Sequence, residues 1–478
     1  MKKKIYPAII LVAMLAIVVL PVSGKAPPSL PLEPTALAYT ADPVRAECWG
    51  WGQDCELPEG TVPFNVDMVD AEDLCVDGEG VYVAVLDTGL LSNYLDFFPP
   101  EMVDIKEEWG KGFSHDLIWV GSGGNWSEEF DYGPVHDDRG FLTYDYGNPH
   151  RYGYPFGSGH GTHVTSIITG WRLDRPDGSF WVRGVAPKVT LIPVLVLDDW
   201  IEFSPDFSAG WWWSGGTWEM VAAGIEYIGN LAKEHDIKIV INLSLGGPSG
   251  SALEEAAIDY AISQGVIVVA SAGNEGYEGM GWPGAFPQVI SVAAAGWTQE
   301  YLRYVTGAPD PWYWWIDDVP EDLWTEDPLG NDFQVYLTDF SSRPNKTLGQ
   351  KFWHLDVAAP GAGVKGPYKP YGWGDWGYYS VWGTSQAAPH IAGIAALLLQ
   401  KNPRMNQFKM EWCLKTAGYF NSLTKWCEKE RTATIFDIFT NDLLDQTWLR
   451  KDYGTGLVQA DEALLVARFM SRRGHRRW

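Results

Sequence analysis

The chain has 478 residues, enough for one large domain or for two or three ordinary ones, and a hydrophobic content of 46% is sufficient for a full core. Its 61 acidic and 35 basic residues give a net charge of −26, which repels phosphate backbones, so we expect no nucleic-acid partner. The 26 tryptophans suit core filling as well as carbohydrate or peptide contact, and composition does not separate these uses.

The first 24 residues have the pattern of a secretory signal peptide. Three lysines, Lys2 to Lys4, precede an apolar run from Ile5 to Val22, and small residues follow at Ser23 and Gly24. The run is also long enough to be an uncleaved membrane anchor. Both interpretations place the rest of the chain outside the cytoplasm, secreted or held at a membrane. Residues 25–59 are proline-rich and without periodicity, and we interpret them as an extension.

Five cysteines in an oxidising compartment favour disulfides between near neighbours. We expect Cys48–Cys55 and Cys413–Cys427, which leaves Cys75 free. Their spacing fits no zinc knuckle.

Apolar, β-branched runs alternate with helical patterns between residues 60 and 464. The runs do not alternate with polar residues, which is typical of parallel strands covered on both faces. The repeated strand–helix order predicts an α/β fold, whose ligands bind at the carboxyl ends of its strands. The expected strands are 81–87, 189–197, 238–245, 265–271 and 289–295, and the expected helices include 217–235 and 251–265.

Three stretches interrupt this rhythm, near 97–158, 297–352 and 415–450. They contain Gly, Trp, Tyr and acidic residues without periodicity, so we interpret them as surface insertions on one domain of residues 60–464. Residues 465–478 form a basic C-terminal tail.

Three motifs carry residue types that act together in nucleophilic catalysis. VAVLDTG places Asp87 at the end of a buried strand, SGHGTHV places His160 between two glycines, and GTSQAAPH places Ser385 at the start of an apolar helix. A serine hydroxyl needs a base to take its proton and a carboxylate to orient that base. The serine is not in a G-x-S-x-G elbow, which counts against an α/β-hydrolase.

Each residue also has a plain structural interpretation. Asp87 alone would be a turn residue, and Ser385 alone would be a helix cap. His160 and His163 share a helix face and have a spacing that suits a metal, although no third ligand motif accompanies them.

Nine ordered motifs between residues 60 and 464 resemble the subtilase family of subtilisin-like serine proteases. The resemblance implies a three-layer subtilisin-like fold, with a mostly parallel sheet and helices on both faces. The motifs are VAVLDTG, GHGTHV, GVAP, VINLSLGGPSG, ASAGNEG, WPGAFPQVISVAA, DVAAPG, GTSQAAPHIAG and YGTGLVQADEAL.

The resemblance implies the catalytic roles position by position. Asp87 corresponds to the orienting aspartate, His160 to the general base and Ser385 to the nucleophile. Asn274 corresponds to the oxyanion-hole residue, whereas composition alone would make it a turn residue. His163 corresponds to a structural histidine.

Substrate binding follows from the same resemblance. Ser244, Leu245 and Gly246 correspond to the segment that pairs with an extended peptide. An open pocket for sizeable apolar or aromatic side chains is expected near Gly246, Gly247, Ser271 and Gly273. Glu275 at its rim would tolerate a basic side chain, or is a solvated surface residue.

Structural calcium is a further implication of the family, with Asp96, Asp174 and Asp177 as oxygen ligands. The chemistry itself needs no cofactor. Solvated loop carboxylates explain the same residues in so acidic a chain.

The sequence therefore predicts a secreted serine endopeptidase that acts on proteins or peptides through an acyl-enzyme. We expect a monomer that meets a membrane only through an uncleaved N-terminal segment. A catalytically silent peptide-binding module and an acyl-transfer peptide ligase remain open. Residue 386 is Gln where the family usually has Met, and residues 25–59 are short for a folding propeptide, so self-activation is in doubt.

Overall fold

The computed structural model describes most of the region between residues 62 and 473. The described ranges are 62–72, 74–91, 93–113, 159–175, 178–203, 210–298, 331, 335–369, 377–420, 430–437 and 442–473. The predicted signal segment, the extension, Cys48, Cys55 and the larger part of the insertion near 97–158 lie outside them.

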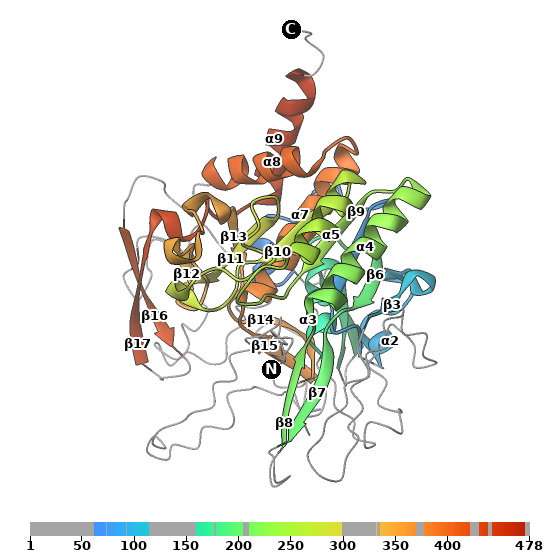
Figure 1. The fold of residues 1–478 in the computed structure, drawn as a ribbon, viewed down its shortest axis with the longest axis horizontal. Helices are drawn as coiled ribbons and strands as arrows, with labels where there is room; N and C mark the ends of the chain where they lie inside the picture. The colour runs from blue at the N-terminus through green and yellow to red at the C-terminus, as the bar shows by residue number, and fades with distance from the viewer. Residues whose placement is uncertain are drawn as a thin grey trace, which may run out of the picture.

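One nine-stranded sheet forms the centre of the molecule (Figure 1). All its pairings are parallel except that of β11 with β12. Its order is β12 (Val335–Leu337), β11 (Ile290–Trp297), β10 (Ile267–Ser271), β9 (Ile239–Leu243), β1 (Tyr82–Asp87), β6 (Thr190–Leu195) and β2 (Asp104–Ile105), with β13 (Val357–Pro360) beside β11 and β3 (Lys111–Gly112) beside β6. The five predicted strands are therefore present.

Helices cover both faces of this sheet. Successive side chains of each strand point to opposite faces, so each face presents apolar groups that pack against a layer of helices. In β1, Val83 and Val85 join the cluster with α3 (His160–Thr169) and α7 (Thr384–Lys401). Ala84 and Leu86 of the same strand join the cluster with α4 (Trp218–His235) and α5 (Ala252–Ser263). The three-layer α/β architecture expected from the sequence is confirmed.

The two predicted helices begin at side-chain caps. The Thr217 hydroxyl accepts a hydrogen bond from the Met220 N–H, and the Ser251 hydroxyl accepts one from the Leu253 N–H. Such caps satisfy backbone donors that the first helical turn leaves without partners. α4 ends at Asp236, which adopts the left-handed conformation. α4 thus matches its predicted bounds within one residue, whereas α5 ends two residues before the predicted 265.

Four two-stranded hairpins were not predicted. They are β4 (Gly170–Arg175) with β5 (Gly178–Arg183), β7 (Asp198–Phe203) with β8 (Gly210–Gly215), β14 (Val364–Tyr368) with β15 (Gly377–Val381), and β16 (Glu430–Asp437) with β17 (Asp442–Leu449). Shorter elements are α1 (Phe64–Asp67), α2 (Tyr94–Phe97), η2 (Glu107–Trp109), η3 (Gly276–Glu278), η5 (Lys346–Leu348), η6 (Phe352–His354) and η8 (Arg450–Asp452).

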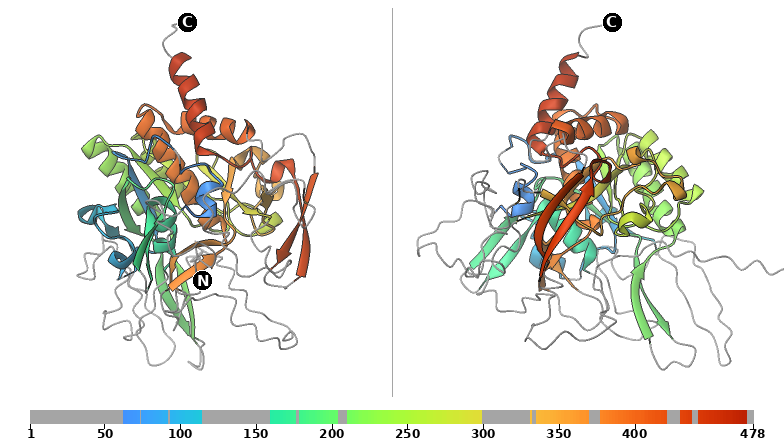
Figure 2. Two further views of the ribbon diagram at one scale, coloured as in Figure 1. Left: turned by 180° about the vertical axis from the view of Figure 1, so that it is seen from behind. Right: turned by 90° about the vertical axis from the view of Figure 1, so that its left-hand side faces the viewer.

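The two C-terminal helices, α8 (Gln407–Phe420) and α9 (Ala460–Arg473), lie at one end of the molecule. Figure 1 and both views of Figure 2 place them opposite the β7–β8 hairpin, and α9 projects away from the body. Part of the expected tail, 465–473, is therefore helical. No helix within the described ranges is long and apolar enough to cross a membrane.

Cys413 on α8 corrects one disulfide prediction. It is a free, fully buried thiol whose Sγ lies 3.3 Å from the carbonyl oxygen of Ala463 on α9. The expected bridge to Cys427 is wrong, because α8 turns this side chain into the core against α9 instead of toward a partner sulfur. Cys75 is free, as predicted.

Candidate active site

Asp87 and His160 form a buried pair at the carboxyl edge of the sheet. β1 ends at Asp87 and α3 begins at His160, and both side chains are at most 1% exposed. The Nδ1 of His160 lies 2.8 Å from Oδ1 and 2.9 Å from Oδ2 of Asp87. An ionised carboxylate only accepts hydrogen bonds, so Nδ1 carries the proton and donates it. Nε2 of His160 is then the atom that can accept a proton.

The glycines on either side of His160 allow this close approach. A Cβ added to Gly161 would lie 2.3 Å from the carbonyl oxygen of Gly89, in the turn that follows Asp87. A Cβ on Gly159 would lie 2.2 Å from the backbone nitrogen of Lys369. Real Cβ atoms are not found at such distances, so Gly161 lets α3 start this near to the turn after β1, and Gly159 lets it start this near to the residue after β14.

Backbone and hydroxyl groups hold the pair in place. The Thr88 N–H donates to Oδ1 of Asp87 at 2.7 Å, and the Thr88 hydroxyl accepts from the Gly161 N–H at 2.9 Å. The residue after the aspartate therefore fixes both the carboxylate and the first turn of the histidine helix. Apart from its place in the VAVLDTG motif, no sequence pattern indicates this role of Thr88.

Ser385 lies in the first turn of α7, which packs against α3. Its hydroxyl donates to the carbonyl oxygen of Ser244 at 3.1 Å, and the side chain is 9% exposed. The hydroxyl of Ser244 donates in return to the carbonyl oxygen of Ser385 at 2.7 Å. Two reciprocal hydrogen bonds thus join the start of α7 to the end of β9.

Pro389 explains why that carbonyl is available. A helical carbonyl normally accepts the N–H four residues later, and proline has none. The oxygen of Ser385 therefore receives no bond from residue 389, and Ser244 supplies a donor. No local sequence pattern connects Pro389 with Ser244, because the two residues are 145 positions apart.

Asn274 follows β10 and faces the same helix start. Its Oδ1 accepts hydrogen bonds from the Thr384 N–H at 2.8 Å and from the Thr384 hydroxyl at 2.9 Å. These bonds fix the orientation of the amide, so that its Nδ2 lies on the other side, 3.5 Å from where a Cβ of Gly383 would be. The Thr384 hydroxyl also accepts from the Gly273 N–H at 3.1 Å. Thr384 is a positioning residue that sequence reasoning missed.

The residues expected to bind substrate gather beside this edge. Ser271 donates to the Leu245 carbonyl at 3.1 Å, while the Leu245 side chain packs into the core, so only its backbone can meet a peptide. Gly247 exchanges two backbone hydrogen bonds with Trp282, at 2.8 and 3.0 Å. This pairing continues the β9 segment past the end of the strand.

The glycines here differ in the room around them. A Cβ on Gly246 would lie 3.7 Å from the carbonyl oxygen of Trp282, an ordinary van der Waals contact, so a methyl group would fit there. A Cβ on Gly273, which has a φ of +102°, would lie 2.5 Å from Oε2 of Glu275. Glu275 is exposed and accepts a hydrogen bond from Ser342 at 3.0 Å. A partner already holds this carboxylate.

His163 is buried like His160 but has a different hydrogen-bond partner. It is fully buried, and its Nε2 donates to the carbonyl oxygen of Val364 in β14 at 3.1 Å. Burial lowers its pKa to about 3, so the ring is neutral at physiological pH. The two histidines do not form a metal pair, because His160 faces Asp87 and His163 faces a hairpin strand.

His390 is a third buried histidine, on α7, that sequence reasoning did not single out. Its Nδ1 donates to the carbonyl oxygen of Gln386 at 2.8 Å, and its Nε2 accepts from Nδ2 of Asn65 at 2.9 Å. Burial lowers its pKa to about 3 as well. It connects α1 to the helix that carries Ser385.

The described residues do not by themselves fit a calcium site. Asp96 accepts from Asn93, and Asp174 pairs with the guanidinium of Arg172 at 3.1 Å, which opposes a cation. Asp177 lies outside the described ranges. Within those ranges, no cluster of three or more His, Cys, Asp or Glu side chains is placed to bind a metal.

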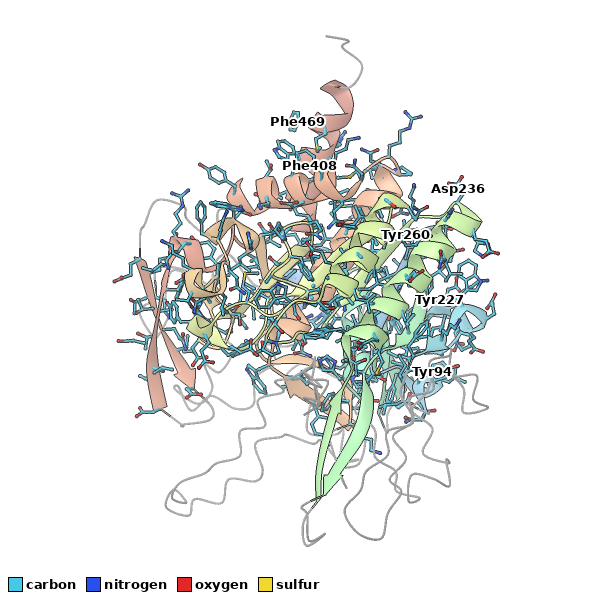
Figure 3. All side chains as sticks on the ribbon, in the orientation of Figure 1. Tyr94, Tyr227, Asp236, Tyr260, Phe408 and Phe469 are labelled. Carbon is cyan, nitrogen blue, oxygen red and sulfur yellow. The ribbon has the colours of Figure 1, made fainter. Side chains whose placement is uncertain are left out.

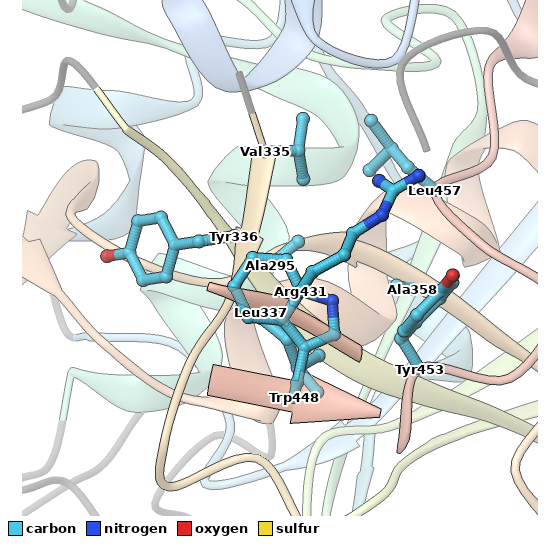
Figure 4. A pocket seen from close by; sticks show the side chains of 9 residues that line it. All are labelled: Ala295, Val335, Tyr336, Leu337, Ala358, Arg431, Trp448, Tyr453 and Leu457. Carbon is cyan, nitrogen blue, oxygen red and sulfur yellow. The ribbon is translucent and has the colours of Figure 1, made fainter. Parts of the chain in front are cut away.

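A small pocket lies apart from these residues, between the sheet edge and the β16–β17 hairpin (Figure 4). It shares no lining residue with the predicted site. Its walls are mainly apolar, with one guanidinium, and comprise Ala295, Val335, Tyr336, Leu337, Ala358, Arg431, Trp448, Tyr453 and Leu457.

A covered parallel sheet, with a buried Asp–His pair and a serine-bearing helix meeting at its carboxyl edge, defines the class of subtilisin-like α/β proteins. The chain belongs to the subtilase family, Peptidase S8, whose model matches residues 78–454.

Curated relatives agree with this assignment, and a solved structure has a similar fold. The chain is 33% identical to subtilisin DY of Bacillus licheniformis over 254 residues, 52% of this chain and 66% of that protein. It is 32% identical to subtilisin E of Bacillus subtilis (strain 168), over 52% of this chain and 48% of that protein. The chain thus spans between about half and two thirds of these relatives. The fold is similar to that of sphericase, with a TM-score of 0.50 and 23% identity, covering 84% of this chain and 98% of that one.

Proposed function

We propose that the chain is a secreted serine endopeptidase that hydrolyses peptide bonds through an acyl-enzyme. The observation that carries the proposal is the bidentate His160–Asp87 hydrogen bond, buried at the edge where α7 presents Ser385. Membership of the subtilase family supports the same reaction class. A peptide-binding module without activity would not need a histidine held by a buried carboxylate in the orientation that general-base catalysis requires.

In the proposed reaction, Nε2 of His160 takes the proton of the Ser385 hydroxyl as the oxygen attacks the peptide carbonyl carbon. Asp87 stabilises the imidazolium that forms. The charged carbonyl oxygen is held by Nδ2 of Asn274 and the Ser385 N–H. His160 returns its proton to the leaving amine, and the carbon–nitrogen bond breaks. Water then repeats the attack on the ester, with His160 again as base, and releases the acid.

Ser385 must first exchange one hydrogen bond. In the structure, the Ser385 hydroxyl donates a hydrogen bond to the Ser244 carbonyl oxygen. For the proposed reaction, the hydroxyl rotates toward Nε2 of His160, which then takes its proton. The peptide would lie along Ser244–Gly246, where its own backbone hydrogen bonds extend the sheet. The resemblance of this segment to the subtilase motif, rather than a measured pocket, supports a sizeable apolar or aromatic side chain at the bond to be cut.

A fluorophosphonate probe tests the nucleophile directly. The purified protein should be labelled, and mass mapping should place the label on Ser385, because the probe reacts only with an activated serine. Ser385→Ala is the matched control and should stay unlabelled. A folded, unlabelled wild-type protein, or a label on another residue, would contradict the proposal.

The same chain in a peptide assay separates hydrolysis from ligation. With a peptide substrate and an added amine nucleophile, hydrolysis should give mainly the free acid. Mainly the amide product would instead identify an acyl-transfer ligase, because both reactions share the acyl-enzyme.

Export from the cytoplasm is part of the proposal and rests on Lys2–Lys4 and the run from Ile5 to Val22. N-terminal sequencing of protein recovered outside expressing cells should find a start after Gly24. Protein retained entirely in the cytoplasm would contradict it.

A further inference from the structure

The end of the molecule formed by α8 and α9 exposes large apolar side chains. Phe408 is 73% exposed and Phe469 is 66% exposed, and Trp412 and Leu465 are about half exposed. Phe408 and Trp412 are four residues apart on α8, as are Leu465 and Phe469 on α9, so each pair shares one helix face. Figure 3 shows Phe408 and Phe469 at the same end of the molecule. We call these four residues the C-terminal apolar face.

α8 and α9 contact each other on their inward sides, away from the C-terminal apolar face. The Cys413 thiol meets the Ala463 carbonyl, and Met410, Ala463 and Ala467 are buried in the core. The inward sides of α8 and α9 therefore already have partners. The face of α9 with Ala463 and Ala467 packs against the core, so the face with Leu465 and Phe469 points outward.

Exposed aromatics continue beside α8. The Lys415 ammonium lies 3.5 Å from the Trp353 carbonyl, which places η6 next to the helix. Phe352 is 62% and Trp353 51% exposed, and the Lys351 ammonium lies over the Trp353 ring at 5.1 Å. Isolated exposed apolar residues are ordinary, but a contiguous group indicates an interaction surface.

The charge around α8 is opposite to that of the whole chain. Residues 401–415 contain four basic side chains and one acidic one, within a chain of net charge −26. Lys415 pairs with Asp356 and Glu411, whereas Lys401, Arg404 and Lys409 are exposed. On α9, Arg468 is exposed next to Phe469. Basic and apolar side chains are thus both exposed on these helices.

Aromatic side chains mixed with lysine and arginine are typical of helices that lie at a membrane interface. Their rings enter the headgroup region, while the long basic side chains reach anionic phosphates. α9 projects from the body of the molecule (Figures 1 and 2). A deformable lipid surface can accommodate such a protruding helix more readily than a preformed groove of a protein partner can. We propose that the C-terminal apolar face docks on an anionic lipid surface.

This docking would leave the candidate active site unobstructed. Ser385 and Lys401 lie at opposite ends of α7, about 25 Å apart for a straight helix. The lipid-facing end and the carboxyl edge of the sheet are thus at two ends of one helix. The proposal is independent of the reaction assigned to the chain.

The test uses the full chain carrying Ser385→Ala, which prevents self-digestion and removes any dependence on activity. Sedimentation with vesicles of phosphatidylcholine is compared with sedimentation with vesicles that also contain phosphatidylglycerol. We expect binding to the anionic vesicles that weakens as salt increases, because salt screens the basic side chains. Equal binding to both vesicle types would overturn the proposal.

Two surface variants identify the face responsible. Phe469→Ser and Lys409→Glu should each lower affinity for the anionic vesicles, Phe469→Ser by about tenfold. Leu443→Ser on β17 and Lys233→Glu on α4 are matched exposed controls and should bind as before. Binding through the apolar run near the N-terminus would be equal in all four variants, and that result would also overturn the proposal.

Solution measurements distinguish lipid from a second copy of the chain. Thermal unfolding of Phe469→Ser should match that of the parent, since the side chain is exposed. Sedimentation velocity should show the same species with and without this substitution. A dimer that Phe469→Ser dissociates would assign the face to self-association and reject the lipid.

Discussion

The buried ionisable groups on the two faces of the central sheet differ in their hydrogen-bond partners. On the face covered by α3 and α7, His160 has a carboxylate partner, His163 a carbonyl partner and His390 partners on both nitrogens. On the face covered by α4 and α5, Glu254 is fully buried, and neither of its carboxylate oxygens has a hydrogen-bond partner among the residues that the structure describes.

The difference separates burial that positions a group from burial that only costs stability. A partnered group keeps a defined orientation, which a catalytic site needs. An unpartnered carboxyl avoids its desolvation penalty by staying protonated, and burial raises the pKa of Glu254 to about 8. Substitutions on the first face should therefore change activity or order, and substitution of Glu254 should change stability alone.

His160→Ala should have the largest effect. Removing the base should reduce kcat by about a millionfold, the scale of single triad losses in subtilisin, with folding intact. Steady-state hydrolysis of a chromogenic peptide measures the rate, and circular dichroism checks the fold. A folded variant with activity within tenfold of the parent would remove His160 from the mechanism.

Asp87→Asn should be next, with a loss of about 10⁴ in kcat. The amide can donate a hydrogen bond to Nδ1, which favours the tautomer that protonates Nε2 and so blocks the base. Activity should recover in part as pH rises, because hydroxide substitutes for the missing base. A pH–rate profile parallel to that of the parent would argue against an orienting role.

His163→Ala tests the neighbouring histidine and should mainly lower the melting temperature. The substitution opens a cavity and removes the bond that holds β14 to α3. Because the folded pKa of about 3 lies below the unfolded value of 6.5, the parent loses stability as pH falls through this window. The variant should show a smaller loss over the same range. A millionfold loss of kcat without unfolding would instead make His163 catalytic.

Glu254→Gln should have the smallest effect, and it should be stabilising. The parent keeps a proton that the unfolded chain has lost, so its stability falls as pH rises from about 4.5 to 8. The variant should melt a few degrees above the parent at pH 9 and close to it at pH 5. Thermal unfolding in the Ser385→Ala background measures this. Equal melting temperatures at pH 9 would show that Glu254 has a partner after all.

The fold was largely predictable because the β-branched runs record burial on both faces. In a chain that alternates strands and helices, a continuous apolar run such as 265–271 indicates a parallel strand buried on both faces. The hairpins were not predictable, because segments such as 198–215 combine Trp, Gly and acidic residues without a period. Contacts between residues that are close in space but distant in sequence could not be predicted either.

The site was predictable through its motifs and less so through its contacts. Asp87 and His160 stand in motifs specific enough to name them, and the structure places them in contact. The roles of Thr384 and Pro389 depend on hydrogen bonds that cross from α7 to β9 and β10, which no local pattern reports. The Cys413 prediction failed for the same reason, because sequence distance says nothing about which side of a helix faces the core.

The hydrogen bonds between Ser244 and Ser385 predict a kinetic consequence of the proposed function. They join the segment proposed to receive the peptide to the backbone of the proposed nucleophile, through a carbonyl that Pro389 leaves without its helical donor. Under that proposal, a shift of the peptide along Ser244–Gly246 would also move Ser385. A change at Ser244 should then alter both KM and kcat.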